Sequence, residues 1–406
     1  MSLEKLEKTL NTHIDDLTAK GIRKGFEMVI TGIKPAGNNQ GPRYYIEGKG
    51  QQEFIKMNAN SYLGLSLRHE LIEAEEEGVR KYGVGPGAVR FISGTHKPHV
   101  DLEKKLASFH SREAAMLFSS AYVTSMGVLV PLITEETVVV SDALNHNCII
   151  NAMKLARPAA KAVYRHNDMK EMEAAIQNNI GKGKRAVVVT DGIFSMRGDH
   201  APLKELVEIC NKYQESFPEG VITVADDSHG VGAFGKTGRG TEEYTNAKVD
   251  VLVGTLGKAF GVNGGYVVSS KTIIAYLKET APMYIYSNPI TVGECYAAIK
   301  ALEILEGKEG ATILEHLRKV TKQFRDGLKK AGYETLEGEH PVVPLMVRDT
   351  AKTKSLVEYL VGKGILATGL NYPVVPKGDE EIRFQISASH TQSDISYVLD
   401  VLAAYK

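Results

Sequence analysis

One lysine occupies a position where its amine could become reactive. The apolar run 249–253 predicts a buried strand, and Gly254 and Gly257 let the chain turn sharply before Lys258. Open α/β sheets bind ligands outside the carboxyl ends of their parallel strands. A lysine that loses solvation there has a lowered pKa, so part of it is neutral amine, the form that makes a Schiff base with an aldehyde. The alternative interpretation is a surface lysine beside a glycine-rich turn.

A second strand end carries an acid and a histidine. The apolar run 221–225 is followed by Asp226, Asp227 and His229, and the strand ending near Lys258 comes next. A carboxylate at a strand end can pair with a protonated pyridine nitrogen, which keeps the ring cationic and makes it an electron sink. This combination resembles the fold-type I pyridoxal-phosphate enzymes, and within them the α-oxoamine synthases, which join an amino acid to an acyl-CoA.

The resemblance covers nearly the whole chain. Its most specific segments are residues 88–95, 141–146, 226–229 and 372–378. Within the family these segments favour the members that condense glycine with acetyl-CoA to 2-amino-3-oxobutanoate, a reaction of glycine and threonine metabolism. Residues 96–99, 121–124 and 259–265 depart from the expected pattern. The open alternatives within the family are an 8-amino-7-oxononanoate synthase and an enzyme like serine palmitoyltransferase.

The resemblance also implies roles around the ring of pyridoxal 5'-phosphate. His146, beyond the predicted strand 137–142, would stack on the pyridine ring, although a lone histidine is more often structural. Asp226 would hold the ring nitrogen protonated, and His229 and Ser195 would bond the phenolic oxygen. Lys258 would carry the cofactor and, once the substrate has displaced it, take the α-proton as a general base.

Small residues after the apolar run 114–118 predict a phosphate site. They open a predicted helix, where backbone N–H groups and the helix dipole face an anion. The resemblance assigns the cofactor phosphate to Ser120, Ala121, Tyr122 and Thr255, and to Ser287 and Asn288 of the second subunit of a homodimer. The bulky Tyr122 and Phe260 are expected near the cofactor, where they would restrict the room for a substrate.

Two residues are expected to bind the amino-acid substrate. Asn60 lies in a segment that is close to the substrate in the family, and the alternative is an asparagine that serves turn geometry. Arg383 alternates with Ile382 and Phe384 along a predicted strand and so faces the other way. The resemblance makes it a two-pronged clamp on the substrate carboxylate, and the alternative is an exposed strand arginine.

Residues 230–237 satisfy the phosphate-loop pattern G-x-x-x-x-G-K-T. A phosphate loop needs a helix that begins at its Lys-Thr, but Gly238 and Gly240 follow here, and glycine is a poor helix former. We therefore interpret Lys236 as a solvated loop residue. A nucleotide-binding module remains the alternative from another functional class, and a catalytically silent subunit is a third, against which the presence of Lys258 argues.

Strand and helix signals alternate between residues 114 and 270, which predicts a mostly parallel α/β sheet. With the resemblance, the expectation is a fold-type I transferase with a seven-stranded central sheet flanked by helices and a small α+β C-terminal domain. The predicted divisions are an arm at 1–56, a large domain at 57–290 and a small domain at 291–406. In the arm, leucine and isoleucine spacing over 2–20 predicts an amphipathic helix packed by one face, and 44–56 a hairpin turning at Gly48 and Gly50.

Composition narrows the class of partner. The 406 residues include 49 Lys and Arg and 49 Asp and Glu, so the formal net charge is zero. The charge balance therefore gives no indication of binding to nucleic acid or to an acidic surface. Cys148, Cys210 and Cys295 are far apart, which indicates neither a disulfide framework nor a metal site. The charged N-terminus and the absence of a membrane-length apolar run favour a cytoplasmic protein, or an organelle-matrix protein if a transit peptide is missing.

Overall fold

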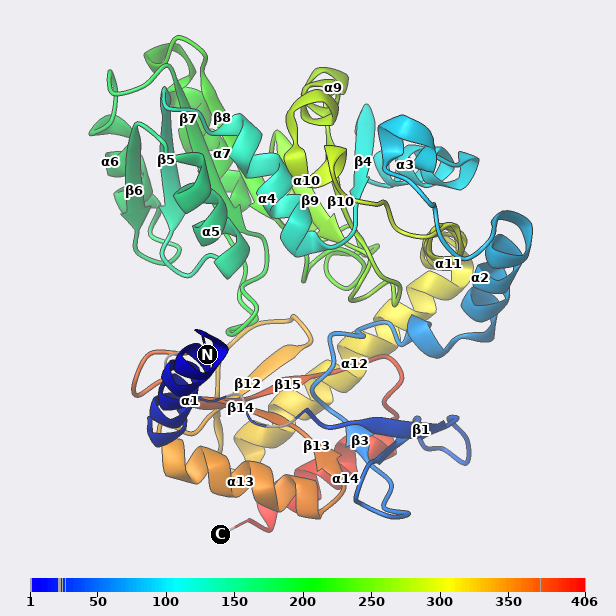
Figure 1. The fold of residues 1–406 in the computed structure, drawn as a ribbon. Helices are drawn as coiled ribbons and strands as arrows, with labels where there is room; N and C mark the ends of the chain where they lie inside the picture. Colours follow the sequence, from blue (N-terminus) through cyan, green and yellow to red (C-terminus); the bar gives the residue numbers. More distant parts are fainter. Residues whose placement is uncertain (1, 21–22, 24, 26, 373, 406) are drawn as a thin grey trace. The chain divides into compact units, whose positions relative to one another are not determined.

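The computed structural model describes residues 2–20, 23, 25, 27–372 and 374–405 (Figure 1). The chain forms two compact units. The larger comprises Asn60–Thr321 and Gly338–Pro341, and the smaller comprises Met1–Ala59, Lys322–Glu337 and Val342–Lys406. The larger unit thus runs beyond residue 290, where the sequence placed a domain boundary. None of the helices formed by the described residues is both long and apolar enough to cross a membrane.

A seven-stranded sheet with the order β4-β10-β9-β8-β7-β5-β6 forms the centre of the larger unit. Its strands are β4 (Ala114–Phe118), β5 (Thr137–Asp142), β6 (Ala160–Tyr164), β7 (Arg185–Asp191), β8 (Val221–Asp226), β9 (Val251–Thr255) and β10 (Gly265–Ser269). Strands β9, β8, β7, β5 and β6 pair in parallel, and β10 is antiparallel to both of its neighbours. The mostly parallel sheet predicted from the sequence is confirmed.

Helices cover both faces of this sheet because alternate residues of each inner strand point to opposite sides. In β5, Val139 packs into the core under α4 (Ala121–Leu132) and α5 (Asn147–Ala156). Val138 and Val140 pack on the other side, under α6 (Met169–Gln177) and α7 (Leu203–Lys212). The two helix layers can be followed in Figure 1. The strand ends between these layers are therefore held rigidly.

The remaining elements of the larger unit surround this core. They are η1 (Leu65–Leu67), α2 (His69–Tyr82), η2 (Arg90–Gly94), α3 (Lys97–Phe109), η3 (Gln214–Ser216), α8 (Thr241–Thr245), α9 (Lys271–Thr280), α10 (Pro282–Ile285), α11 (Val292–Glu306) and α12 (Lys308–Lys330), the last of which continues into the smaller unit.

The smaller unit is α+β. Its antiparallel sheet has the order β11-β12-β15-β14 and consists of β11 (Glu334–Thr335), β12 (Val342–Met346), β14 (Thr368–Leu370) and β15 (Glu381–Gln385). Helices α13 (Thr350–Gly362) and α14 (Gln392–Ala403) belong to it, as do α1 (Ser2–Ala19), β1 (Ile30–Lys34), β2 (Arg43–Ile46) and the parallel pair β3 (Ile55–Lys56) and β13 (Ile365–Leu366).

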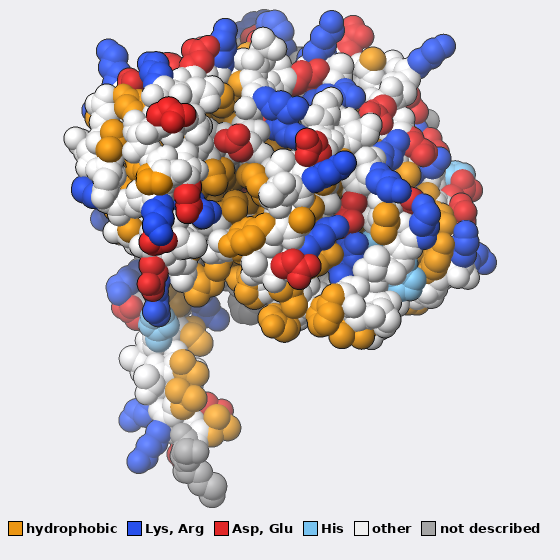
Figure 2. Space-filling model, turned by 90° about the horizontal axis from the view of Figure 1, so that it is seen from above, with side chains coloured by type: hydrophobic (Ala, Val, Ile, Leu, Met, Phe, Trp, Pro, Cys, Tyr) orange, Lys and Arg blue, Asp and Glu red, His pale blue; other side chains and the backbone are white. Residues whose placement is uncertain are grey.

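The arm confirms one expectation and corrects another. Tyr44 and Phe54 exchange backbone hydrogen bonds across a turn in which Gly48 and Gly50 have positive φ, as the predicted hairpin requires. Helix α1 forms, but its apolar face is not packed: Leu3 and Leu6 are 63% and 52% exposed. Figure 2 shows this hydrophobic face along the projecting helix. The spacing predicted the helix correctly, and within the described single chain its apolar face has no packing neighbour.

Candidate active site

Two acids meet at the carboxyl edge of the central sheet. Asp191 and Asp226 are the last residues of β7 and β8, and the parallel register places them opposite each other. Lys258 follows the end of β9, the next strand of the sheet. One cavity gathers the polar groups at these strand ends; it is lined by Ala121, Tyr122, His146, Cys148, Asp191, Ile193, Ser195, Asp226, Ser228, His229 and Lys258. Seven residues proposed from the sequence thus line this one cavity.

The Asp226 carboxylate is held from two sides. Its Oδ2 accepts a hydrogen bond from Ser125 Oγ at 2.6 Å, and its Oδ1 accepts from the backbone N–H and the hydroxyl of Ser228 at 3.1 and 2.5 Å. Ser125 comes from α4 and Ser228 from the turn after β8, so both elements fix the acid. A carboxylate with these hydrogen bonds is positioned for one specific partner in the cavity.

The neighbouring Asp191 lacks such support. Burial first, and the negative charge of Asp226 second, raise the pKa of Asp191 well above its ordinary value. Its Oδ2 accepts from the backbone N–H of His146, while Oδ1 is buried with no hydrogen-bond partner in the part of the chain that the structure describes. The raised pKa means that the Asp191 carboxyl favours its protonated form beside the Asp226 charge, and a cationic ring nitrogen bound beside Asp226 would weaken that effect.

His146 is held in one tautomer. It is the N-cap of α5, and its Nδ1 accepts from the backbone N–H of Cys148 at 3.3 Å, with Cys148 Sγ at 2.9 Å. An accepting Nδ1 leaves the proton of the neutral ring on Nε2. Burial lowers the pKa of His146, so the ring is neutral at pH 7. A neutral imidazole suits stacking on a cationic ring better than an imidazolium does.

His229 is fixed by residues that the sequence analysis did not assign. Its Nδ1 lies 2.7 Å from the hydroxyl of the fully buried Tyr62, and its carbonyl oxygen lies 2.8 Å from Nε2 of His340. The Tyr62 hydroxyl also lies 3.3 Å from Oδ1 of Asn60. Asn60 is not on the cavity wall, but Tyr62 connects it to His229. Nothing in the local sequence indicates these long-range contacts.

The chain after Lys258 needs glycine. Gly261 has φ +73°, and a Cβ there would lie 2.5 Å from the backbone nitrogen of Ser66. The N–H of Gly261 donates to the carbonyl of Lys258, and the N–H of Leu256 donates to Gly264. This closed turn holds Lys258, half-buried, at the cavity wall.

The predicted phosphate loop forms the start of α4. Ser120 caps this helix, with its Oγ accepting from the N–H of Val123 at 3.3 Å, and Ala121 and Tyr122 line the cavity. Thr255 is buried; its hydroxyl donates to the Gly264 carbonyl and accepts from the N–H of Gly257. The helix start offers backbone donors to an anion, whereas the Thr255 hydroxyl serves the turn before Lys258.

Besides Asn60, Ser120 and Thr255, four further predicted residues do not line this cavity. Ser287 is half-buried and Asn288 is exposed, both beyond α10, and their assignment to a second subunit stays a prediction. Arg383 lies half-buried on β15 of the smaller unit, opposite Pro344 and Thr368, and its role also stays a prediction. Phe260 was wrongly expected near the cofactor. It is fully buried against Phe109, with ring centroids 6.1 Å apart, because the closed turn directs it into the core.

A half-buried histidine joins two of the loops at the site. His166 Nδ1 lies 3.1 Å from Asp142 Oδ1, and its Nε2 lies 3.1 Å from Asp199 Oδ2. Burial alone would lower the pKa of His166, but the hydrogen bonds to the two carboxylates raise it to about 9. Asp142 precedes the segment that carries His146, and Asp199 follows Ser195, so the imidazolium connects the two. The sequence analysis missed this residue.

A carboxylate of the protein itself accepts hydrogen bonds from the end of the G-x-x-x-x-G-K-T segment. The Glu243 carboxylate accepts from the backbone N–H groups of Thr237 and Arg239 and from the Thr237 hydroxyl. Gly238 and Gly240 have positive φ, and α8 begins only at Thr241. The Thr237 backbone and hydroxyl donors are occupied and no helix begins at Lys236-Thr237, which agrees with the rejection of that motif.

Comparison with known proteins gives the family. Residues 52–402 match the family described as aminotransferase class I and II. The 8-amino-7-oxononanoate synthase of Thermosipho melanesiensis is 36% identical over 95% of this chain and 94% of its own. The mitochondrial 2-amino-3-ketobutyrate coenzyme A ligase of Bos taurus is 37% identical over 97% and 90%. A solved structure described as SPT with PLP internal aldimine superposes with a TM-score of 0.87 at 25% identity, over 98% and 96% of the two chains.

The chain therefore belongs to the class I and II aminotransferase family of pyridoxal 5'-phosphate enzymes and, within it, to the α-oxoamine synthases. It is a pyridoxal-phosphate-dependent acyltransferase with the fold of that family. The residues present fit the cofactor: Lys258 would supply an amine for its aldehyde, Asp226 a carboxylate for its ring nitrogen, and His146 a neutral ring.

Proposed function

We propose that the protein condenses glycine with acetyl-CoA to give 2-amino-3-oxobutanoate and coenzyme A. The observation that carries this proposal is a bulky side chain fixed at the cavity wall. The Tyr122 hydroxyl donates to Asn147 Oδ1 at 2.9 Å and accepts from Asn151 Nδ2 at 2.7 Å. Its ring meets the His146 ring edge-on, with centroids 6.2 Å apart. Because these hydrogen bonds hold the tyrosine ring beside the reacting groups, the ring limits the space for substrates and favours a small amino acid and a short acyl chain.

Pyridoxal phosphate supplies an electron sink that stabilises negative charge at the α-carbon of a bound amino acid. Asp226 would maintain the positive charge of the ring, and His146 would cover one face of it. The Lys258 amine would serve as the general base that takes the α-proton. His229, oriented by Tyr62, and Ser195 would bond the phenolic oxygen. Arg383 and Asn60 would each bind the substrate carboxylate.

A second member of the same family is the main rival. Relatives named 8-amino-7-oxononanoate synthase match this chain at 33–37% identity, and relatives named 2-amino-3-ketobutyrate coenzyme A ligase match it at 37%. Such similar values do not discriminate between the two, so the choice depends on the room in the site. The rival enzyme would need space for a longer acyl chain beside Tyr122.

The test measures kcat/KM for acetyl-, pimeloyl- and palmitoyl-CoA, each with glycine, alanine and serine. Glycine with acetyl-CoA should be preferred, and propionyl-CoA should also react because one methylene changes discrimination by only about 1–3 kcal/mol. Tyr122→Ala should shift preference toward the longer chains, whereas Tyr122→Phe, which keeps the ring, should not. If alanine with pimeloyl-CoA or serine with palmitoyl-CoA is the better pair in the wild type, the substrate assignment fails.

A further inference from the structure

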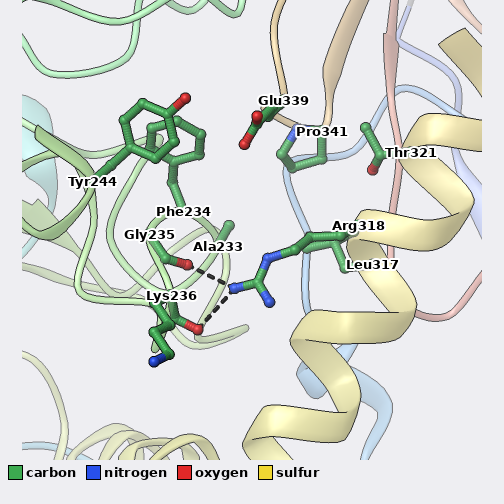
Figure 3. A pocket seen from close by; sticks show the side chains of 10 residues that line it. All are labelled: Ala233, Phe234, Gly235, Lys236, Tyr244, Leu317, Arg318, Thr321, Glu339 and Pro341. Carbon is green, nitrogen blue, oxygen red and sulfur yellow. Dashed lines mark hydrogen bonds between the residues drawn. The ribbon is translucent and has the colours of Figure 1, made fainter.

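A second, larger cavity lies in the same unit, and the proposed reaction does not use it. It has a volume of about 260 Å³ and is formed by residues 233–236, Tyr244, the middle of α12 (Leu317, Arg318 and Thr321), Glu339 and Pro341 (Figure 3). Pockets for small molecules commonly measure about 300–1,000 Å³. This cavity is therefore suited to a small metabolite and is too small for coenzyme A.

One wall of the cavity is apolar. The rings of Phe234 and Tyr244 stack with centroids 4.3 Å apart at 32°, and Leu317 and Pro341 complete the surface. Stacked aromatic rings make a rigid wall because neither ring can turn without displacing the other. Such a wall suits the apolar side chain of a ligand.

A buried hydroxyl also faces this space. Thr321 is 2% exposed, lines the cavity, and its Oγ1 has no hydrogen-bond partner among the described residues. A buried polar group without a partner is costly, and most such groups in proteins are satisfied by protein, water or a ligand. The hydroxyl thus marks a point where a polar atom of a ligand would be stabilised.

Three charged side chains surround the opening. Arg318 Nη2 donates to the carbonyl oxygens of Gly235 and Lys236 at 2.7 and 2.8 Å, which fixes the guanidinium. Figure 3 shows Glu339 on the opposite side of the cavity. Arg318, Lys236 and Glu339 form no ion pair within the ranges that the structure covers. Burial, and then the Glu339 charge, raise the pKa of Tyr244, so this carboxylate acts across the cavity.

We propose that this cavity binds a free α-amino acid with an apolar side chain. Its carboxylate would pair with Arg318, and its ammonium group with Glu339. Its side chain would lie against Phe234 and Leu317. A cation and an anion on opposite sides of an apolar pocket are complementary to a zwitterion, and a simple carboxylate or a simple amine would use only one of them.

The cavity also adjoins the active site. Glu339 is followed by the fully buried His340, whose Nε2 lies 2.8 Å from the His229 carbonyl and whose ring lies 5.7 Å from that of Phe234. An amino acid that draws Glu339 inward therefore acts on the segment that supports His229. The site is one of regulation, separate from the substrate site at Lys258.

The test uses holoenzyme reduced with borohydride, which closes the Lys258 site to substrate amines. Isothermal titration compares L-leucine with L-leucinamide, which lacks the carboxylate, and with 4-methylpentanoate, which lacks the ammonium group. Leucine should bind at millimolar concentration and the two analogues about ten- to a hundred-fold more weakly. Equal binding of 4-methylpentanoate overturns the zwitterion assignment, and no binding of leucine overturns the site.

Two variants and one control locate the binding. Arg318→Met and Glu339→Gln should each weaken leucine about ten-fold or more, while Arg318→Met should leave leucinamide unchanged. Lys319→Met, the neighbouring exposed cation on α12, should bind leucine normally. Fluorescence of the reduced cofactor should change over the same leucine range. Leucine affinity unaffected by both variants overturns the site, and unchanged fluorescence overturns the link to His229.

Discussion

At the scale of single residues, the site depends on which of two adjacent acids faces the cofactor. Asp226 is on the cavity wall, whereas Asp227 accepts from the N–H and hydroxyl of Thr241 at 2.6 and 2.7 Å. Burial raises the pKa of Asp227 to about 7. A Cβ on Gly192 or Gly230 would clash with its carboxylate, so the surrounding backbone closes over it. Asp227 is therefore a structural acid.

Replacing Asp226 tests this division of roles. In Asp226→Asn the charge that pairs with the ring nitrogen is lost, so cofactor retention and α-deuterium exchange of glycine should both fall. A hydrogen bond to a charged group contributes about 1.5–3 kcal/mol, or about one to two decades in rate. Asp227→Asn is the matched control and should retain the cofactor. Near-normal exchange in Asp226→Asn would show that another group holds the nitrogen.

The residues predicted from the sequence are those that follow strand ends. Lys258, Asp226 and His146 were found because each lies at the end of an apolar run or in the short turn that follows it. Asp191 and Tyr62 were not assigned, although both support the site. Their importance comes from contacts with residues far along the chain, which no local pattern encodes.

At the scale of elements, the helices and inner strands were predictable because burial on both faces demands unbroken apolar runs. The edge strand β6 was not predicted. Its burial alternates, with Lys161 and Val163 exposed, so its sequence lacks that signal. The antiparallel pairing of β10 with β4 was equally hidden, since strand order depends on tertiary packing and not on periodicity.

His166 joins two of these elements, and its charge makes the connection pH-dependent. Its pKa in the folded protein is about 9, above the value of about 6.5 for an unfolded histidine. The stabilisation is therefore complete below about pH 6.5 and is lost as the pH rises through about 9. Urea unfolding of the wild type should show this fall in the free energy of unfolding, and His166→Asn should not. Parallel pH profiles for the two proteins would contradict the prediction.

At the scale of the whole molecule, the main expectation is that each active site contains residues from both subunits of a homodimer. The cavity wall in one chain contains neither Ser287 nor Asn288. If these residues complete the phosphate site of a partner, each active site of a homodimer needs both chains. The exposed face of α1 is a further surface that a single chain leaves uncovered.

Mixed dimers test this expectation. A Lys258→Ala chain and an Asn288→Ala chain should each form a dimer of low activity. A dimer with one chain of each kind should regain one intact site, because Lys258 of one chain would meet Asn288 of the other. Activity of the purified mixed dimer should therefore approach half that of the wild type. No recovery would mean that Asn288 serves the site of its own chain.

The loop occupied by Glu243 has a consequence for how phosphate-loop matches are interpreted in other sequences. The carboxylate that accepts from the backbone and hydroxyl of Thr237 is six residues beyond it in the sequence. A sequence that matches the motif can therefore also encode an acid that occupies its final donors. A glutamate a few positions after such a match, following Gly-x-Gly, is a reason to examine whether the chain supplies its own counter-charge.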